Sequence, residues 1–296
     1  MQVLILGYGE MGHAMEALLG EHHGLAIWEK FPHEGFQPVR LEDAAPQADF
    51  AIFCLPAAPH REILDEVRGL LQGHCVCISV AKGLDKDGKP VFEVFQDVLG
   101  PESPFALLYG PMIAEDIRAG GQGFAQAGCG TAALFEHVAG LFRGSRLRLA
   151  HSTDLCGLSW CAVLKNVYAI GFGVVDELGW GDNPRGLMMV QSLRELERIA
   201  ANLGGQPETC RGLAGLGDLV TTATSDGSHH HALGRKLARG ETRDISGEGV
   251  HTLAMLEQSD LLNCEAYPLL TVIRTIIKDP LETRKYFRAY IDSCFP

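Results

Sequence analysis

The sequence lacks an excess of positive charge. It contains 25 Lys and Arg against 37 Asp and Glu, which gives a formal net charge of -12 at pH 7. Proteins that bind the phosphate backbone of nucleic acids do so mainly through Lys and Arg, which release counterions. The charge balance therefore argues against a nucleic-acid partner, and an anionic small molecule would need a locally positive site.

The sequence also lacks CxxC pairs and other zinc-ligand spacings. Its nine cysteines are dispersed along the chain, and only Cys75 and Cys77 lie close together. An odd number of dispersed thiols is typical of reduced cysteines that pack as small apolar residues. We therefore expect reduced core cysteines and no bound metal.

We expect no signal peptide, because the first residues run directly into an apolar segment that ends at Gly7. A secretory signal would begin with a basic region and end in small residues at a cleavage site. No short repeat or low-complexity tract is visible either. We expect a cytoplasmic location.

Residues 155–175 form one apolar stretch that is long enough for a membrane span by length alone. One charged residue, Lys165, lies in its middle, and a charged lysine in hydrocarbon costs several kcal/mol. The sequence therefore predicts no membrane span but a buried helix that walls an active-site cleft, with Asn166 as a fixed donor and acceptor beside the lysine. The alternative is that Lys165 lies at a helix edge and extends its amine into solvent.

The length of 296 residues, with 46% hydrophobic and 21% charged residues, is typical of a globular protein of two domains, which we place at residues 1–150 and 151–296. Continuous apolar runs, which strands buried on both faces require, recur in the first half at Val3–Leu6, Leu25–Trp28, Phe50–Leu55, Cys75–Val80 and Phe105–Tyr109. Long helix-compatible segments follow at 154–178, 184–204, 230–240, 248–263 and 266–278. The predicted fold is α/β, with an N-terminal Rossmann doubly wound parallel sheet and a C-terminal all-helical domain.

A glycine-rich turn follows the first apolar run and has the pattern GxGxxG. Gly7 permits the tight turn from strand to helix, Gly9 lets a pyrophosphate approach the backbone, and Gly12 lets the helix pack closely on the strand. The phosphates would meet the free N–H groups of the helix start, which includes Glu10 and Met11. The motif predicts a dinucleotide site, and the alternative is a simple glycine turn.

The second apolar run ends in an acidic residue, Glu29, which lies 17 residues after Gly12. A carboxylate at this place accepts hydrogen bonds from the adenosine ribose hydroxyls and repels a 2′-phosphate. NAD is therefore favoured over NADP as the cofactor. Lys30, the next residue, offers a charge that could instead serve a 2′-phosphate.

A second lysine, Lys82, follows the fourth apolar run. The carboxyl ends of parallel strands face the ligand crevice, so we expect Lys82 near the nicotinamide. If Lys82 and Lys165 face each other, each lowers the other's affinity for a proton, which makes a lysine a usable acid or base near neutral pH. The alternative for Lys82 is an ordinary lysine of a surface loop.

The chain resembles the NAD-dependent glycerol-3-phosphate dehydrogenase family over essentially its whole length. The matching segments, in chain order, are Gly7–Gly12, Ser79–Leu84, Gly110-Pro111 with Ala114-Glu115, Leu164–Ile170, Gly179–Asn183, Pro207–Thr209, Gly212–Leu219 and Glu248-Gly249. The resemblance implies that Lys165 donates the proton in carbonyl reduction and accepts it in the reverse direction. It also implies that Lys82 contacts both the substrate and the nicotinamide.

Other roles come from the same resemblance. Asp218 and Asn166 would hydrogen-bond the reacting oxygen and its lysine, and Thr222 would hold the substrate. Ala114 and Glu248 would line the cofactor site, and the substrate site would include Gly110. The resemblance further implies a homodimer.

The chain departs from the family where members carry a Ser-Arg-Asn sequence that binds the substrate phosphate. Here the residues are Ser228, His229 and His230, followed by His231. Arginine offers a permanent charge and a planar fork, whereas a neutral histidine offers one donor. We expect these substrate-binding residues to hold phosphate more weakly, and the histidines are also compatible with a solvated loop or a metal site.

Two more departures alter the expected substrate pocket: Val190–Ser192 replaces a Thr-Arg-Gly sequence, and Met112-Ile113 replaces a small residue followed by Phe. The sequence therefore predicts hydride transfer between NADH and a small, anionic substrate, with dihydroxyacetone phosphate as the first candidate. One alternative is an NAD(P)-dependent reductase of a different small oxo acid, imine or non-phosphorylated ketone. Another is a non-catalytic NAD(H)-binding sensor.

Overall fold

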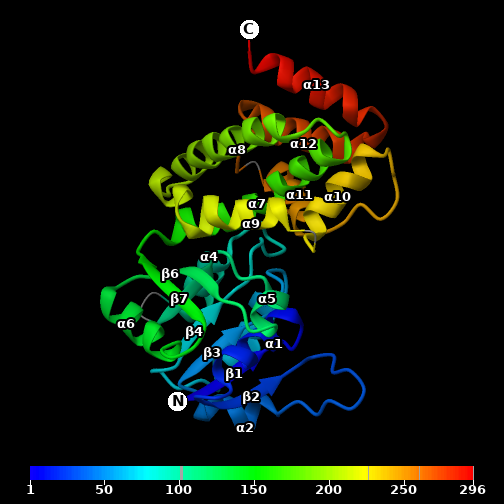
Figure 1. The fold of residues 1–296 in the computed structure, drawn as a ribbon. Helices are drawn as coiled ribbons and strands as arrows, with labels where there is room; N and C mark the ends of the chain where they lie inside the picture. The colour runs from blue at the N-terminus through cyan, green and yellow to red at the C-terminus, as the bar shows by residue number, and fades with distance from the viewer. Residues whose placement is uncertain (101–102, 226, 260, 296) are drawn as a thin grey trace. The chain divides into compact units, whose positions relative to one another are not determined.

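The computed structural model describes residues 1–100, 103–225, 227–259 and 261–295, and the chain forms two compact units (Figure 1). The first unit comprises Met1–Asp85 with Lys89–Ser159, and the second comprises Lys86–Gly88 with Trp160–Pro296. Each unit has its own fold.

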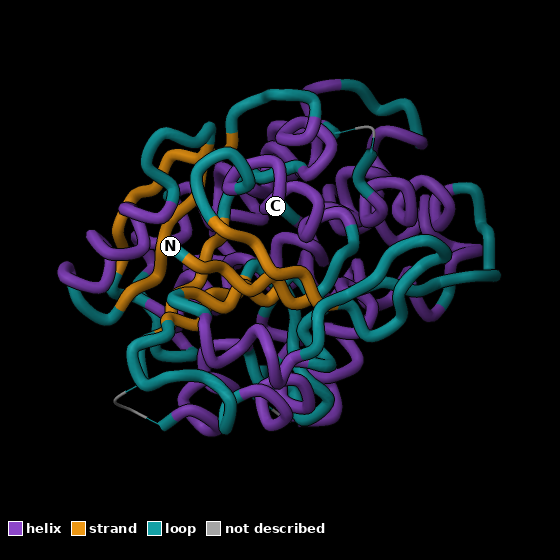
Figure 2. The backbone as a smooth tube through the Cα atoms, turned by 90° about the horizontal axis from the view of Figure 1, so that it is seen from below, coloured by secondary structure: helices purple, strands orange, loops and turns teal. Residues whose placement is uncertain are grey.

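A seven-stranded sheet forms the first unit, and Figure 2 shows its strands side by side in orange. The strands are β1 (Gln2–Leu6), β2 (Gly24–Trp28), β3 (Phe50–Phe53), β4 (Val76–Ser79), β5 (Phe105–Tyr109), β6 (Gly123–Cys129) and β7 (Leu147–Ser152). Their order is β2-β1-β3-β4-β5-β6-β7, and the neighbours are parallel except β5 and β6. The strand order reverses at β1, because β2 lies on one side of it and β3 on the other, as a doubly wound fold requires.

The five apolar runs expected to form strands do so, but β6 and β7 were not expected, and β6 runs antiparallel to β5. Neither strand contains a continuous apolar run. β7 alternates between buried or half-buried and exposed positions, and β6 is rich in small residues. Strands near the edge of a sheet need less apolar surface than central ones, so a search for continuous apolar runs misses them.

Helices cover both faces of the sheet. The helices of this unit are α1 (Glu10–Leu19), α2 (Leu41–Ala44), α3 (His60–Val67), α4 (Val91–Leu99), α5 (Ala114–Arg118) and α6 (Ala132–Leu141), with a short turn η1 (Ala45–Gln47). Alternate strand residues such as Val3 and Ile5 share one core cluster with apolar residues of α1, α5 and α6. On the other side α3 packs against α4. The Rossmann prediction is confirmed.

The second unit is helical among its described residues. Its elements are α7 (Leu155–Glu177), α8 (Asp182–Asn202), η2 (Pro207–Arg211), η3 (Leu213–Gly217), α9 (Asp218–Thr224), α10 (His229–Ala238), α11 (Glu248–Ser259), η4 (Cys264–Ala266), α12 (Pro268–Lys278), η5 (Pro280–Glu282) and α13 (Thr283–Ser293). In the described chain only α7 is long and apolar enough to cross a membrane, and its apolar window is fully buried. A core helix of this kind is what the central lysine predicted.

Two helices of the second unit were not expected, α9 and α13. In α13 the buried residues Thr283, Phe287 and Tyr290 are separated by polar ones, so the helix has a narrow apolar stripe and a polar remainder. The segment expected as 248–263 ends earlier, at Ser259, and residue 260 lies outside the described residues. The segment expected from 266 starts as a helix at Pro268, since proline fits the first helical turn.

Candidate functional site

The glycine turn of the first unit has the geometry that the motif predicts. Gly7 has φ +99°, a conformation that favours glycine. A Cβ on Gly12 would lie 2.3 Å from the carbonyl oxygen of Gly7, whereas a Cβ on Gly9 would meet no heavy atom within 4 Å. Gly12 therefore packs the helix against the turn, while Gly9 faces open space where a bulky anion can approach.

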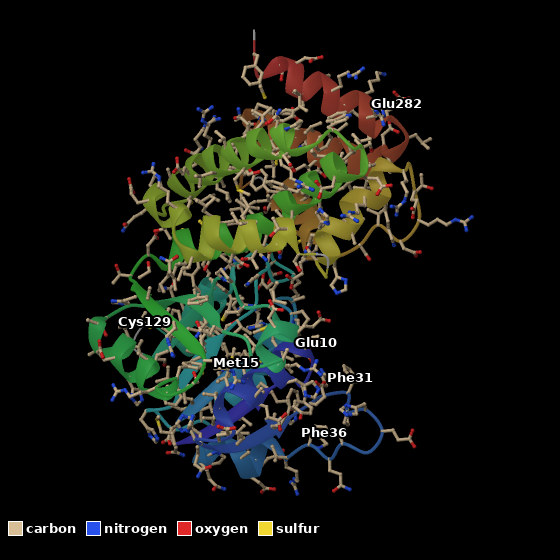
Figure 3. All side chains as sticks on the ribbon, in the orientation of Figure 1. Glu10, Met15, Phe31, Phe36, Cys129 and Glu282 are labelled. Carbon is tan, nitrogen blue, oxygen red and sulfur yellow. The ribbon has the colours of Figure 1, made fainter. Side chains whose placement is uncertain are left out.

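Free backbone donors lie beside this open space at the start of α1. The first bond of the helix runs from the N–H of His13 to the carbonyl of Gly9, so the N–H groups of Glu10 and Met11 precede the helical ladder. The side chain of Glu10, labelled in Figure 3, forms an ion pair of 2.8 Å with Arg118. Open space at Gly9 and N–H donors at a helix start suit a dinucleotide pyrophosphate.

The carboxylate of Glu29 is fixed at the end of β2. Its oxygens accept hydrogen bonds from the N–H of Tyr8, at 2.7 Å, and from the N–H of Phe31, at 3.0 Å. The ammonium of Lys30 forms an ion pair of 2.5 Å with Glu62, which raises the pKa of Lys30. Glu29 thus contacts the glycine turn, and Lys30 is paired with Glu62 of α3.

Lys82 and Gly110 lie together in the first unit, because the ammonium of Lys82 donates a hydrogen bond of 3.1 Å to the Gly110 carbonyl. Gly110 has φ +153°, and a Cβ there would lie 2.5 Å from the carbonyl oxygen of Phe124. Ala114 begins α5 shortly after. The loops that follow β4 and β5 therefore meet at the carboxyl edge of the sheet, where ligands of such folds bind.

Sequence reasoning did not identify a buried histidine that supports the Lys82 loop. His60 is fully buried, and its Nδ1 lies 2.8 Å from the Pro56 carbonyl. Its Nε2 lies 2.9 Å from the Ser79 hydroxyl, which accepts a hydrogen bond from the N–H of Ala81. Burial lowers the pKa of His60 to about 4, so the ring is neutral near pH 7. No motif marks such a residue, since its partners are backbone groups and one serine.

In the second unit, Lys165 is held within a buried polar cluster. Its ammonium lies in the middle of α7, with 6% of the residue exposed. It donates to the hydroxyl of Thr222 at 2.7 Å and lies 3.3 Å from a carboxylate oxygen of Asp218. The hydroxyl of Thr222 in turn donates to the backbone carbonyl of Asp218. The lysine therefore does not extend to solvent from a helix edge; α7 and α9 enclose it.

Backbone packing explains how Asp218 reaches Lys165. The short turn η3 precedes α9, and a Cβ on Gly215 would lie 2.1 Å from the carbonyl oxygen of Cys210. Only glycine lets η3 pack this closely on η2. This packing places Asp218 at the start of α9, where it faces α7.

Asn166 and Glu248 form the next contact of the cluster. The Asn166 side-chain amide donates a hydrogen bond of 3.2 Å to the carboxylate of Glu248 at the start of α11. Beside this contact, the backbone N–H of Gly249 donates to Nε2 of His230 at 3.2 Å. Residues from α7, α10 and α11 that are far apart in the sequence therefore lie together.

The histidine run has three different environments. His229 is exposed, whereas His230 is half-buried and its pKa is lowered to about 4 by burial first, and then by the charges of Lys165 and His229. His231 is buried, and its Nε2 lies 2.7 Å from the carboxylate of Asp176. The hydroxyl of Ser228 accepts a hydrogen bond from the N–H of His231 and so caps α10. The run is therefore not a uniformly solvated loop.

A surface pocket opens beside His230. It lies between the face of α10 and the segment that leads into α11, and its lining residues are His229, His230, Ala232, Leu233, Lys236, Asp244, Ser246, Gly247 and Glu248. Among the described residues no group of three or more His, Cys, Asp or Glu side chains is arranged to hold a metal ion.

The predicted site residues thus form two sets, one in each unit. The cofactor residues Gly7–Gly12 and Glu29 lie along the carboxyl edge of the sheet in the first unit, as does the pair of Lys82 and Gly110. The cluster around Lys165 belongs to the second unit. That the two lysines face each other remains a prediction.

Comparisons with known proteins cover both units of the chain. A family model described as NAD-dependent glycerol-3-phosphate dehydrogenase N-terminus matches residues 30–129, and one for the C-terminus matches residues 154–288. The glycerol-3-phosphate dehydrogenase (NAD(P)+) of Agrobacterium fabrum is 30% identical, over 95% of this chain and 94% of the relative. The one of Rhodospirillum rubrum is 38% identical, over 72% of this chain and 63% of the relative.

Solved structures show the same fold. The glycerol-3-phosphate dehydrogenase structure from Coxiella burnetii superposes with a TM-score of 0.85 at 24% identity, covering 98% of each chain. The corresponding enzyme structure from Saccharomyces cerevisiae gives a TM-score of 0.81 at 20% identity, covering 99% of each chain. On the strength of the two family models and the full-length relatives, the chain belongs to the NAD-dependent glycerol-3-phosphate dehydrogenase family.

Proposed function

We propose that the protein is a dehydrogenase that reversibly transfers a hydride between NAD(H) and a small substrate, with the pair glycerol 3-phosphate and dihydroxyacetone phosphate as the first candidate. The buried ammonium of Lys165, fixed between Asp218 and Thr222, is the observation that carries the proposal. Burying a charged lysine is costly, so it persists where the charge is used. Full-length relatives carry the name glycerol-3-phosphate dehydrogenase (NAD(P)+).

The first unit holds the cofactor in this proposal, with residues 1–150 as the NAD-binding domain. The open face at Gly9 and the helix donors of Glu10 and Met11 suit the pyrophosphate. The fixed carboxylate of Glu29 suits the two ribose hydroxyls of NAD and opposes a 2′-phosphate, while Lys30 is engaged by Glu62. Bound NADH supplies the hydride.

The second unit supplies the proton, with residues 151–296 as the substrate-binding domain. As the substrate carbonyl gains negative charge, Lys165 donates a proton to its oxygen, and in the reverse direction the lysine accepts it. Asp218 and Thr222 hold the ammonium in one orientation. Asn166 lies next to the lysine, and its amide is fixed by Glu248, which also lines the cofactor site in this proposal.

The remaining proposed contacts follow the family resemblance. Lys82 and Gly110 approach the substrate from the first unit, together with cofactor contacts of Lys82 and Ala114. In the second unit we propose substrate contacts of Thr222 and of the start of α10, with Ser228 and His229, and His230 lies beside them. We propose an anionic substrate, since Lys82 and Lys165 both carry positive charge.

We further propose a cytoplasmic homodimer. No cysteine in the described part of the chain forms a disulfide, which suits a reducing compartment. The dimer follows the family resemblance alone. Light scattering coupled to size-exclusion chromatography would give the mass directly, and a monomer at micromolar concentration would contradict the dimer.

The test of the reaction is NADH oxidation by the purified protein with dihydroxyacetone phosphate. We expect turnover with NADH, slower turnover with NADPH, and loss of turnover in Lys165→Ala. NADH that binds but is not oxidised would contradict this substrate, and full activity of Lys165→Ala would contradict the role of the lysine.

A second candidate is a reductase of a different small oxo acid, imine or non-phosphorylated ketone. It is favoured by the neutral state of His230, which brings no permanent charge to a phosphate group. A panel of carbonyl compounds with and without phosphate, assayed with NADH, separates the two candidates. Preference for the non-phosphorylated members would support the second.

A further inference from the structure

His230 acts as a cap on a neighbouring helix. Its Nε2 accepts the backbone N–H of Gly249, the second residue of α11. An N–H group in the first turn of a helix has no acceptor within its own helix. The imidazole provides that acceptor from α10, in the way that Ser or Asp side chains usually do.

The cap requires a neutral ring. A nitrogen that accepts a hydrogen bond carries no proton, so the proton of the neutral imidazole is on Nδ1. Burial and the charges of Lys165 and His229 keep the pKa of His230 near 4. At neutral pH the ring therefore carries no charge that could attract a phosphate group.

The ring is also fixed from several sides. A Cβ on Gly249 would lie 3.0 Å from the carbonyl oxygen of Asn166 and 3.2 Å from Cδ2 of His230, so α7, α10 and α11 pack closely at this point. α10 is itself tied to α7, because His231 bonds to Asp176. The ring of His230 therefore connects α10 to the start of α11.

We propose that His230 is a positioning residue that fixes the start of α11, and with it the contact between Glu248 and Asn166, beside Lys165. In this role His230 does not bind the anionic group of the substrate. This inference rests on the proposed function, in which Asn166 and Glu248 border the reacting groups. Its consequence is that any anionic end of the substrate must be bound by other residues.

The first test reads the ring itself and needs no substrate. In ¹⁵N-labelled protein, two-bond ¹H–¹⁵N correlations report the tautomer of each histidine, and the signal lost in His230→Gln assigns His230. We expect a neutral Nδ1–H ring that does not titrate between pH 5.5 and 8. The charged groups that face it are Lys165 of α7, His229 of its own helix and Glu248 of α11. Titration near pH 6.5 would overturn the proposal, whatever the substrate proves to be.

The second test separates positioning from substrate binding. His230→Leu removes the acceptor, and His230→Gln puts an amide oxygen near the place of Nε2. We expect His230→Leu to lower kcat about tenfold, equivalent to about 1.4 kcal/mol, because one hydrogen bond and the fixed helix start are lost. His230→Gln should restore most of the loss. The exposed His74→Leu is the matched control.

The opposite pattern would overturn the proposal. If the ring binds an anion, His230→Leu raises the KM for the carbonyl substrate with kcat unchanged, and His230→Gln does not rescue it. Wild-type KM would then also rise as pH increases through 6.5. If dihydroxyacetone phosphate is not a substrate at all, the NMR titration still decides between the two roles.

Discussion

The two units build their parts of the site in different ways. In the first, backbone geometry prepares the cofactor site: open space at Gly9, close packing at Gly12 and the free N–H groups of α1. In the second, side chains form the site. Lys165, Asp218 and His230 come from three helices, and the packing of these helices brings Lys165 into an ion pair with Asp218 and near enough to His230 to lower its pKa. A backbone site lies within a few consecutive residues, and a side-chain site is assembled from distant ones.

This difference predicts which property, chemistry or NADH binding, is lost when each part of the site is mutated. Removal of a side-chain function in the second unit should abolish chemistry and leave NADH binding intact. Addition of a single methyl group to the turn of the first unit should weaken NADH binding and leave the fold intact.

The largest effect is expected from Lys165→Met, which keeps the length of the side chain and removes the proton donor. General acid catalysis contributes about 10²- to 10⁴-fold, so kcat should fall by about that factor. NADH affinity, measured by nicotinamide fluorescence, should change less than about threefold, because the glycine turn is in the other unit. A parallel loss of NADH affinity would show that the two sets of residues are not separable.

The next effect is expected from Gly9→Ala. Because φ at Gly9 is -80° and no atom lies within 4 Å of the added Cβ, the protein should unfold at an unchanged temperature. The methyl group would occupy the space of the pyrophosphate, so NADH affinity should fall at least about tenfold, equivalent to 1.4 kcal/mol. The exposed Gly69→Ala, which also meets no atom within 4 Å, is the control. Unchanged NADH affinity in Gly9→Ala would place the cofactor elsewhere.

The same difference explains what could be predicted from the sequence. The glycine turn and Glu29 follow each other over a short span, and a motif at fixed spacing reveals them. Lys165 was marked by one charge in an apolar helix, but its contact with Asp218 came only from the family resemblance, and its contact with Thr222 was not predicted. The small-residue strand β6 and the amphipathic α13 were missed, since neither contains a long apolar run.

Residues that act through a neighbour were harder still to predict. His60 bonds to Ser79 and a backbone carbonyl, and His230 bonds to the N–H of Gly249. Neither contact can be predicted from the composition of the sequence or from the spacing of its residues. His230 was expected to touch a substrate because of its place in the chain, whereas the structure gives its Nε2 a partner within the protein.

A smaller effect is expected from Glu29→Gln, which removes the negative charge and keeps one amide oxygen as an acceptor for the N–H of either Tyr8 or Phe31. Loss of repulsion toward a 2′-phosphate should raise the ratio of kcat/KM for NADPH to that for NADH about tenfold. Glu21→Gln, on the exposed turn after α1, is the control of equal charge change. An unchanged ratio would mean that Glu29 does not border the ribose.

The last comparison concerns stability rather than turnover and uses one histidine of lowered pKa in each unit. The pKa values of His60 and His230 are both lowered to about 4 from an ordinary 6.5, so the unfolded chain binds a proton more readily than the folded one. Stability from this source is complete above pH 6.5 and is lost as pH falls from 6.5 to 4, by at most about 3 kcal/mol for His60. His60→Gln should therefore flatten the fall in unfolding free energy over that window, measured by urea denaturation, whereas exposed His74→Gln should not. His230→Gln should flatten it less, because that residue is only half-buried, and an equal slope in all variants would show that neither ring is held neutral by its unit.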